Sequence, residues 1–462
     1  MRILLLNPPG CRTYIRDYFC SKTTKSNYLF HPIDLVILSG TLAEEHDISV
    51  LDCMAERLGP EAAEERISSL APEVLISLVG SVSWDEDRPF LAGQAAQGRR
   101  VIAIGDVLHE NSLQRLADEP WLEAALHVFS NRDAVHYLAN ERDQIQDMTV
   151  RDDSGTPLRI SDGPAAKRRG SYRVPRPRHE LFPDHGYHFS FARKRRFATV
   201  LTDYGCPYPC TFCVIGTLGF QTRPVEDVLE EIDALRSRGV TELFVMDQTF
   251  GVDRPRGLEL CAAFEERGDL SWTAFTRPDR ATEEMLRAMQ RAGCHTVIMG
   301  VESADDELLA TYRKGYRASE VGAAFQRAHA AGMRTVGTFI IGLPEETQSS
   351  LEATLKLAIE LEMDFMSINV AVPRFGTPFR AQVMQLGLAN AQDLVMDQGG
   401  ADAFLPTNTL DRAQMLRLKK RMVRRFYLRP TYLLRRLAGI RSLYELRAQV
   451  REGVALLSRN TR

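Results

Sequence analysis

Cys206-Pro-Tyr-Pro-Cys210-Thr-Phe-Cys213 is the stretch that decides how this sequence is interpreted. It lies in the loop after residues 199–202, a short run that predicts a buried β-strand. The chain has only eight cysteines in 462 residues, so chance is a poor explanation for three of them within eight positions. Three thiolates this close together can hold either zinc or an iron–sulfur cluster.

The residues around the triplet, 197–385, alternate strand-like and helix-like segments and predict a partial (β/α)6 barrel. The expected strands are 199–202, 242–246, 271–275, 296–300, 335–341 and 365–370. In such barrels the chemistry lies on the loops that follow the strands. The triplet is therefore expected at the barrel mouth.

A structural zinc site normally has a fourth Cys or His close by. Here the nearest histidines precede the first barrel strand, and the next cysteine is Cys261. A loop with only three ligands fits a [4Fe–4S] cluster that leaves one iron open for a substrate or cofactor. Zinc stays as the alternative.

Residues 1–150 predict a doubly wound, Rossmann-like α/β domain, because short apolar runs alternate with amphipathic stretches. Ligands of such domains bind beyond the carboxyl ends of the strands. A Pro-, Gly- and charge-rich linker is expected over 151–196. The predicted strands of the domain are 3–6, 48–51, 74–78, 101–104 and 124–129.

Residues 386–462 predict a basic helical tail. Between positions 411 and 462 there are 15 Lys or Arg and 3 Asp or Glu, although the net charge of the chain is −3. Met415, Leu418, Met422 and Phe426 recur at helical spacing, which gives one apolar face. We expect the tail to dock on its own acidic body; an anionic membrane surface, a lipid-like substrate and nucleic acid are the alternatives.

Composition favours a globular chain, with 44% hydrophobic and 26% charged residues. No apolar run approaches the length of a membrane span, and the N-terminal apolar run is too short for a signal peptide. A cytoplasmic location is expected.

The cysteine motif at the mouth of a partial barrel resembles the radical S-adenosylmethionine (SAM) superfamily. In that family the three cysteines, here Cys206, Cys210 and Cys213, hold a [4Fe–4S] cluster whose open iron binds SAM. Cleavage of SAM then yields a 5′-deoxyadenosyl radical. The resemblance implies further SAM contacts at strand ends, namely Phe212 at the adenine, Asp247 and Gln248 near the amino group, Glu302 and Ser303 at the ribose or carboxylate, and Gly342 beneath the adenine.

The Rossmann-like domain before the barrel resembles the cobalamin-binding branch of this superfamily. The resemblance implies that small or polar strand-end residues admit cobalamin, namely Asn7, Pro8, Gly80, Ser81 and Gly105. The pattern Asp-x-His-x-x-Gly, which supplies a His to cobalt in many cobalamin proteins, is absent. A domain that keeps the fold but has lost the cofactor is the alternative. Residues 12–22, rich in aromatic and basic side chains, either fold over the strand ends and order on a substrate or form a surface loop.

The function implied is a cobalamin-dependent C-methyltransferase that acts on an unactivated carbon of a small-molecule or lipid-like substrate. An electron donor such as flavodoxin or ferredoxin is the expected partner. Nucleic acid is not expected, because no RNA-binding domain is visible after the barrel. The alternatives are a radical cyclase or rearrangement enzyme, with or without cobalamin, and a non-enzymatic zinc or nucleic-acid-binding protein. The basic tail allows peripheral contact with a membrane.

Overall fold

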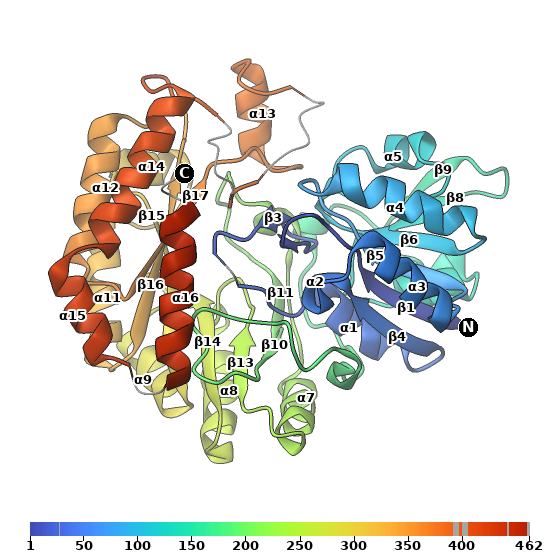
Figure 1. The fold of residues 1–462 in the computed structure, drawn as a ribbon, viewed down its shortest axis with the longest axis horizontal. Helices are drawn as coiled ribbons and strands as arrows, with labels where there is room; N and C mark the ends of the chain where they lie inside the picture. The colour runs from blue at the N-terminus through green and yellow to red at the C-terminus, as the bar shows by residue number, and fades with distance from the viewer. Residues whose placement is uncertain (27, 391–396, 400–404, 441–442, 460–462) are drawn as a thin grey trace.

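A computed structural model describes all residues except 27, 391–396, 400–404, 441–442 and 460–462. Two largely parallel sheets, one near each end of the molecule, form the centres of two lobes (Figure 1). The predicted fold class, a Rossmann-like domain followed by a partial barrel and a helical tail, is confirmed.

The first sheet has the strand order β4-β1-β5-β6-β7-β8-β9. Its five parallel strands contain short apolar runs, which is why the sequence revealed them, and all but the edge strand β4 are largely buried. They are β1 (Arg2–Asn7), β4 (Asp47–Asp52), β5 (Val74–Leu78), β6 (Arg100–Ile104) and β7 (Ala124–Leu126). The helices of this domain are α1 (Ile33–Leu42), α2 (Cys53–Glu56), α3 (Pro60–Leu70), α4 (Trp84–Ala96), α5 (Ser112–Asp118) and α6 (Asp133–Leu138).

Two strands of this sheet lie at or beyond its expected end at residue 150. β8 (Asp147–Arg151) and β9 (Pro157–Ser161) add antiparallel strands next to β7. β9 therefore falls inside the segment 151–196 that was predicted to be a linker. Its residues are only partly buried or exposed, so it lacks the apolar run that marks a central strand.

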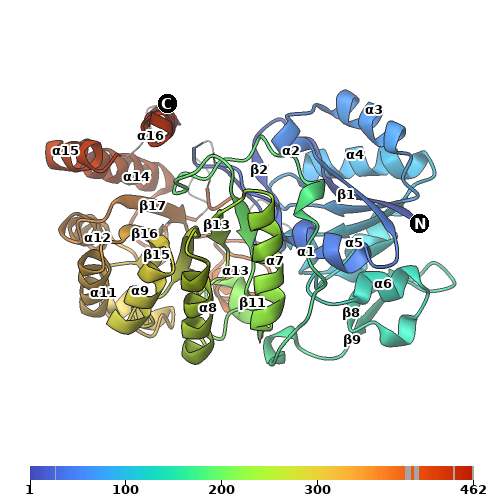
Figure 2. The ribbon, with the colours of Figure 1, turned by 90° about the horizontal axis from the view of Figure 1, so that it is seen from below.

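The second sheet has six parallel strands in sequence order, as a partial barrel requires. They are β10 (Ala198–Val200), β13 (Glu242–Val245), β14 (Ser271–Thr276), β15 (Cys294–Glu302), β16 (Arg334–Ile341) and β17 (Phe365–Val370). Helices run along its outer side (Figure 2). They are α7 (Val225–Ser237), α8 (Arg254–Arg267), α9 (Glu283–Arg291), α11 (Ala318–Ala330) and α12 (Gln348–Glu360). The short helix α10 (Asp306–Thr311) follows β15.

The C-terminal helices lie beside the last barrel strand, next to β17 (Figure 2). Phe426 is fully buried in the barrel core, and Arg436 forms an ion pair with Asp364 at 2.9 Å. The tail is thus docked on its own body, as expected. The helices after the barrel are α13 (Pro378–Gln385), α14 (Arg412–Tyr427), α15 (Pro430–Ala438) and α16 (Leu443–Arg459).

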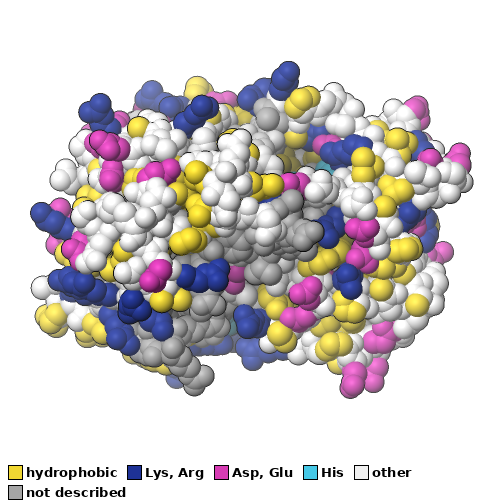
Figure 3. All heavy atoms as spheres, turned by 90° about the horizontal axis from the view of Figure 1, so that it is seen from above, with side chains coloured by type: hydrophobic (Ala, Val, Ile, Leu, Met, Phe, Trp, Pro, Cys, Tyr) yellow, Lys and Arg dark blue, Asp and Glu magenta, His cyan; other side chains and the backbone are white. Residues whose placement is uncertain are grey.

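Lys and Arg side chains gather on the barrel side of the molecule, toward the left in Figure 3. One shallow surface depression on α14 is lined by basic residues alone, namely Arg417, Lys420, Arg421, Arg424 and Arg425. No helix in the described part of the chain is long and apolar enough to cross a membrane.

Residues 13–25, which we call the strand-end segment, fold over the carboxyl ends of the first sheet. The segment contains the short antiparallel pair β2 (Tyr14–Ile15) and β3 (Lys22–Thr23). The fully buried guanidinium of Arg16 donates to the carbonyls of Pro8 and Pro9 (2.8 and 3.1 Å) and pairs with Asp87 at 2.7 Å. This segment is therefore part of the core and not a surface loop.

Replacing Arg16 with Met should destabilise the protein by about 3 kcal/mol, because it leaves the Asp87 carboxylate buried without its partner. Urea unfolding followed by circular dichroism measures the change. Arg88→Met is the matched control, since Arg88 is 57% exposed and pairs loosely with Glu119 at 3.4 Å. It should shift stability by no more than about 0.5 kcal/mol. Equal effects of both substitutions would contradict the structural role of Arg16.

Candidate active site

The cysteine loop connects the strands of a small antiparallel hairpin, β11 (Asp203–Gly205) and β12 (Phe220–Thr222). The amide of Cys206 donates to the carbonyl of Gly219 at 2.8 Å, and the amide of Cys213 donates to the carbonyl of Cys210 at 3.1 Å. A short 3-10 helix, Val214–Thr217, follows directly. Backbone hydrogen bonds thus fix both ends of the loop, which presents three free thiols.

Arg277, at the end of β14, places a positive charge beside the loop. Its Nη1 lies 3.7 Å from the sulfur of Cys210, and its guanidinium lies 3.7 Å from the ring centre of Tyr208. A cation here favours thiolate and any anionic group bound to it. Burial, followed by the neighbouring thiols, raises the pKa of Cys213 to about 12, so an unliganded loop holds this group as a thiol.

The thiol arrangement fits a [4Fe–4S] cluster better than a single metal ion. Within the described ranges, no three His, Cys, Asp or Glu side chains converge to hold one ion. A cluster does not require such convergence, because each thiolate binds a different iron. Cys206, Cys210 and Cys213 are therefore the residues that would hold it.

Phe212 and Glu302 lie together next to the cysteine loop. The ammonium of Lys314 forms an ion pair with Glu302 at 2.7 Å and lies 5.5 Å from the ring centre of Phe212. Glu302 has a φ of 63°, a strained conformation for a residue with a side chain. A side chain on Gly300 would come within 2.5 Å of the Glu302 carboxylate, so Gly300 leaves the room that this carboxylate occupies.

A large cavity of about 1390 Å³ joins the cysteine loop to the rest of the interior. It is lined at this end by Phe212, Cys213, Gln248, Glu302 and Thr338. Its volume exceeds the range of about 300–1000 Å³ that is usual for a single small ligand. The cavity can therefore accommodate SAM together with a second molecule.

Three of the residues expected at SAM do not line the cavity. Asp247 accepts hydrogen bonds from the amides of Thr202 and Asp203 at 2.6 and 3.1 Å. Ser303 accepts from the amide of Asp305 at 3.1 Å and thereby shapes the turn before α10. Gly342 has a φ of 92°, so this turn requires a residue without a side chain. In this structure all three support the backbone of the site.

Of the residues expected at cobalamin, Asn7, Pro8, Gly80 and Ser81 are covered by the strand-end segment, whereas Gly105 packs against Val79. A side chain on Gly80 would come within 2.7 Å of Ser21, and one on Gly105 would come within 1.7 Å of the Val79 carbonyl. Ser81 donates to Asp106, and so does Ser21. Asn7 and Pro8 both accept hydrogen bonds from Arg16, as does Pro9. The room left for a large cofactor is the cavity between this segment and the barrel.

Arg374 connects the two lobes at that cavity. It follows β17, donates to the carbonyl of Ser21 at 3.2 Å and pairs with Asp106 at 3.3 Å. Its Nη2 is buried and has no hydrogen-bond partner among the described residues. It thus offers a donor to a ligand in the cavity.

Sequence reasoning missed Arg277. Arg277 follows β14 as part of Thr276-Arg277-Pro278, directly at a strand end. That position was the available signal, because the chemistry of such barrels lies on strand-end loops.

Comparison with known proteins agrees with this geometry. Residues 200–358 match the model of the radical SAM superfamily. The uncharacterized methyltransferase PH0819 of Pyrococcus horikoshii is 27% identical over 418 residues, which cover 87% of this chain and 89% of that protein.

Two solved structures share the fold over most of this chain. The radical SAM methyltransferase TsrM of Kitasatospora setae, with cobalamin and a [4Fe–4S] cluster bound, has a TM-score of 0.64 at 19% identity, covering 85% of this chain and 79% of TsrM. The cobalamin-dependent radical SAM enzyme OxsB, in its apo form, has a TM-score of 0.67 at 16% identity, covering 98% of this chain and 71% of OxsB. At these identities the likeness establishes the fold.

Glu346 should give the protein a pH-dependent stability. It is 1% exposed and accepts hydrogen bonds from the amides of Gly342 and Leu343, and burial raises its pKa to about 8. An unfolded chain ionises this carboxyl near 4.5, so the folded state loses stability as pH rises from 4.5 to 8.

Glu346→Gln removes this titration. Between pH 5 and pH 8 the variant should therefore gain about 3 kcal/mol relative to the unsubstituted protein. Urea unfolding at both pH values measures the gain. A Glu346→Gln profile parallel to that of the unsubstituted protein would refute the assignment.

Proposed function

Because the chain belongs to the radical SAM superfamily through residues 200–358, we propose that it is a cobalamin-dependent radical SAM enzyme that methylates an unactivated carbon. The observation that carries the proposal is the single cavity that begins at Cys213 and Phe212 and continues between the barrel and the first domain. When bound, the cluster, SAM and cobalamin together supply a 5′-deoxyadenosyl radical and a transferable methyl group.

The chain's own residues would bind and orient the two cofactors. Cys206, Cys210 and Cys213 would hold the cluster, and Arg277 would offset its negative charge. Phe212 offers a flat apolar face to the adenine of SAM. Glu302 can accept hydrogen bonds from ribose hydroxyls, and Lys314 holds its carboxylate in place at 2.7 Å.

The barrel interior would exclude water from the reaction. Phe244, Phe275 and Ile298 line the cavity together with Val336. None of these side chains carries an S–H or O–H group whose hydrogen atom could quench a radical. A dry, apolar wall around the reacting carbon protects such an intermediate.

Cobalamin would lie between the strand-end segment and the barrel mouth. Asp17, Cys20 and Lys22 face that part of the cavity from the first domain, and Arg374 faces it from the barrel side. The space, and the spare donor of Arg374, support this position. The strand ends themselves are filled by Ser21 and Arg16, so contact would run through the strand-end segment.

A radical rearrangement or cyclisation without cobalamin is the second candidate. The observation that favours it is the close packing of Ser21 on Gly80 and Ser81, which leaves no open cradle at the strand ends. The third interpretation, a non-enzymatic zinc or nucleic-acid-binding protein, is overturned by the family match, since the chain is an enzyme. The flavodoxin or ferredoxin donor, the cytoplasmic location and a membrane contact stay predictions.

Replacing any one of Cys206, Cys210 or Cys213 with Ala should reduce SAM cleavage to below about 1% of its original rate, because the cluster would lose a ligand. Formation of 5′-deoxyadenosine under anaerobic conditions with a chemical reductant measures the loss. Cys261→Ala is the control, because this thiol is buried in the barrel core. It should keep its iron and its activity. Retained cleavage in any of the three loop variants would contradict the proposal.

Protein reconstituted without oxygen with iron, sulfide and hydroxocobalamin should contain about four irons and about one cobalt per chain. Metal analysis and the visible spectrum of cobalamin measure both. Methylation should also release S-adenosylhomocysteine in addition to 5′-deoxyadenosine. Four irons with no cobalt would overturn the methyl-transfer proposal in favour of the second candidate.

A further inference from the structure

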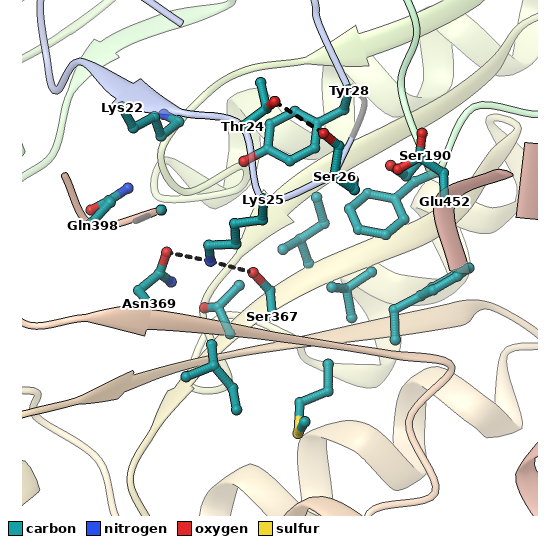
Figure 4. Close-up of a pocket in the computed structure, with 18 of the residues that line it drawn as sticks. Lys22, Thr24, Lys25, Ser26, Tyr28, Ser190, Ser367, Asn369, Gln398 and Glu452 are labelled. Atoms are coloured by element: carbon teal, nitrogen blue, oxygen red, sulfur yellow. Dashed lines mark hydrogen bonds between the residues drawn. The ribbon is translucent and has the colours of Figure 1, made fainter. Parts of the chain in front are cut away.

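One branch of the cavity leads away from the cysteine loop and contains a lysine from the opposite lobe. Lys25, at the end of the strand-end segment, reaches across to β17 (Figure 4). Its ammonium donates to the hydroxyl of Ser367 at 2.9 Å and to the amide oxygen of Asn369 at 2.7 Å. The side chain lines the cavity and is partly buried.

Lys25 has no carboxylate as a hydrogen-bond partner among the described residues. Both of its bonds go to neutral oxygens, although an ammonium group has three hydrogens to donate. Burial, followed by the positive charges of Lys419 and Lys22, lowers its pKa well below the usual value. The nearby Asp397 is itself engaged by the backbone of Thr23 and Gly399. A partly buried cation that is bonded only to neutral oxygens is stabilised by an anion.

The wall beyond Lys25 is mostly apolar, with Arg436, Gln449 and Glu452 among its polar side chains, and it continues to the surface. Phe365 and Tyr427 line the cavity near β17, and Leu437, Leu446 and Val450 line it further along α15 and α16. Leu437 is 63% exposed and Val450 is 57% exposed, so this end opens to solvent. A ligand that fills the branch buries an apolar body there and places a polar group at Lys25.

We propose that the substrate is an amphipathic anion whose carboxylate or phosphate group binds Lys25 and whose apolar chain lies along α15 and α16. This inference rests on the proposed function, because it assigns the substrate of the same cavity. The strand-end segment and the C-terminal helices then have one shared role, since each forms one side of the substrate pocket.

The test measures binding of three ligands with the same chain: decanoate, decyl phosphate and decanol. Equilibrium dialysis is done on the reconstituted holoenzyme with SAM, below the micellar concentration of each ligand. At least one of the two anions should bind the unsubstituted protein at least about tenfold more tightly than decanol does, as one desolvated ion pair provides. The anion that binds more tightly identifies the anionic group of the substrate.

Lys25→Met should abolish the preference for the anion, and Lys25→Arg should restore most of it. The restoration shows that charge, and not merely the fold, is responsible. Leu437→Gln should weaken the binding of all three ligands. Leu434→Gln is its matched control, because Leu434 is 68% exposed on the same helix and does not line the cavity. Leu434→Gln should leave the binding of all three ligands unchanged.

Equal binding of decanol and both anions, a preference that survives Lys25→Met, or no saturable binding below about 1 mM would each overturn the inference. SAM cleavage by the same preparation separates this result from the proposed function. Cleavage without anion-selective binding refutes only the substrate assignment. Selective binding without cleavage refutes the radical enzyme and leaves the ligand site in place.

Discussion

The carboxylate of Asp106 is the point at which three separate parts of the chain meet. It accepts hydrogen bonds from the amide and hydroxyl of Ser21, from the amide and hydroxyl of Ser81, and from the guanidinium of Arg374. It is 3% exposed, so these bonds replace water at a buried charge. One carboxylate thus joins the first sheet, the strand-end segment and the loop after the last barrel strand.

The shape of the cavity follows from this junction. Ser21 is held at the strand ends, so the residues after it must leave the first sheet and run toward the barrel. That path carries Lys22 and Lys25 into the space between the lobes, where Lys25 bonds to Ser367 and Asn369. The cysteine loop forms one end of this space and the C-terminal helices form the other. The site is therefore built from both lobes, and neither contains it alone.

Sequence reasoning located the central strands of both sheets and the cysteine loop, because each leaves a pattern. Buried parallel strands are continuous apolar runs, and thiol ligands have a fixed spacing. The edge strand β9 has no such run, so the sequence predicts a linker at these residues. The sequence also does not show whether a strand-end side chain points into the cavity or toward the backbone. Asp247 was expected at SAM but accepts a hydrogen bond from the amide of Thr202. No sequence pattern predicts a role for Lys25, because its hydrogen-bond partners lie on β17, more than 300 residues later in the chain.

The continuity of the strand-end segment has a consequence for exchanging domains between related enzymes. The segment belongs to the first domain in sequence, yet Lys25 completes a pocket whose other wall is β17. A chimera cut between the lobes would pair one protein's lysine with another protein's strand and mismatch the Asp106–Arg374 contact. The unit that can be exchanged intact is the first domain together with β17 and the loop after it, so modularity in this architecture follows the contacts at the junction and not the order of the chain.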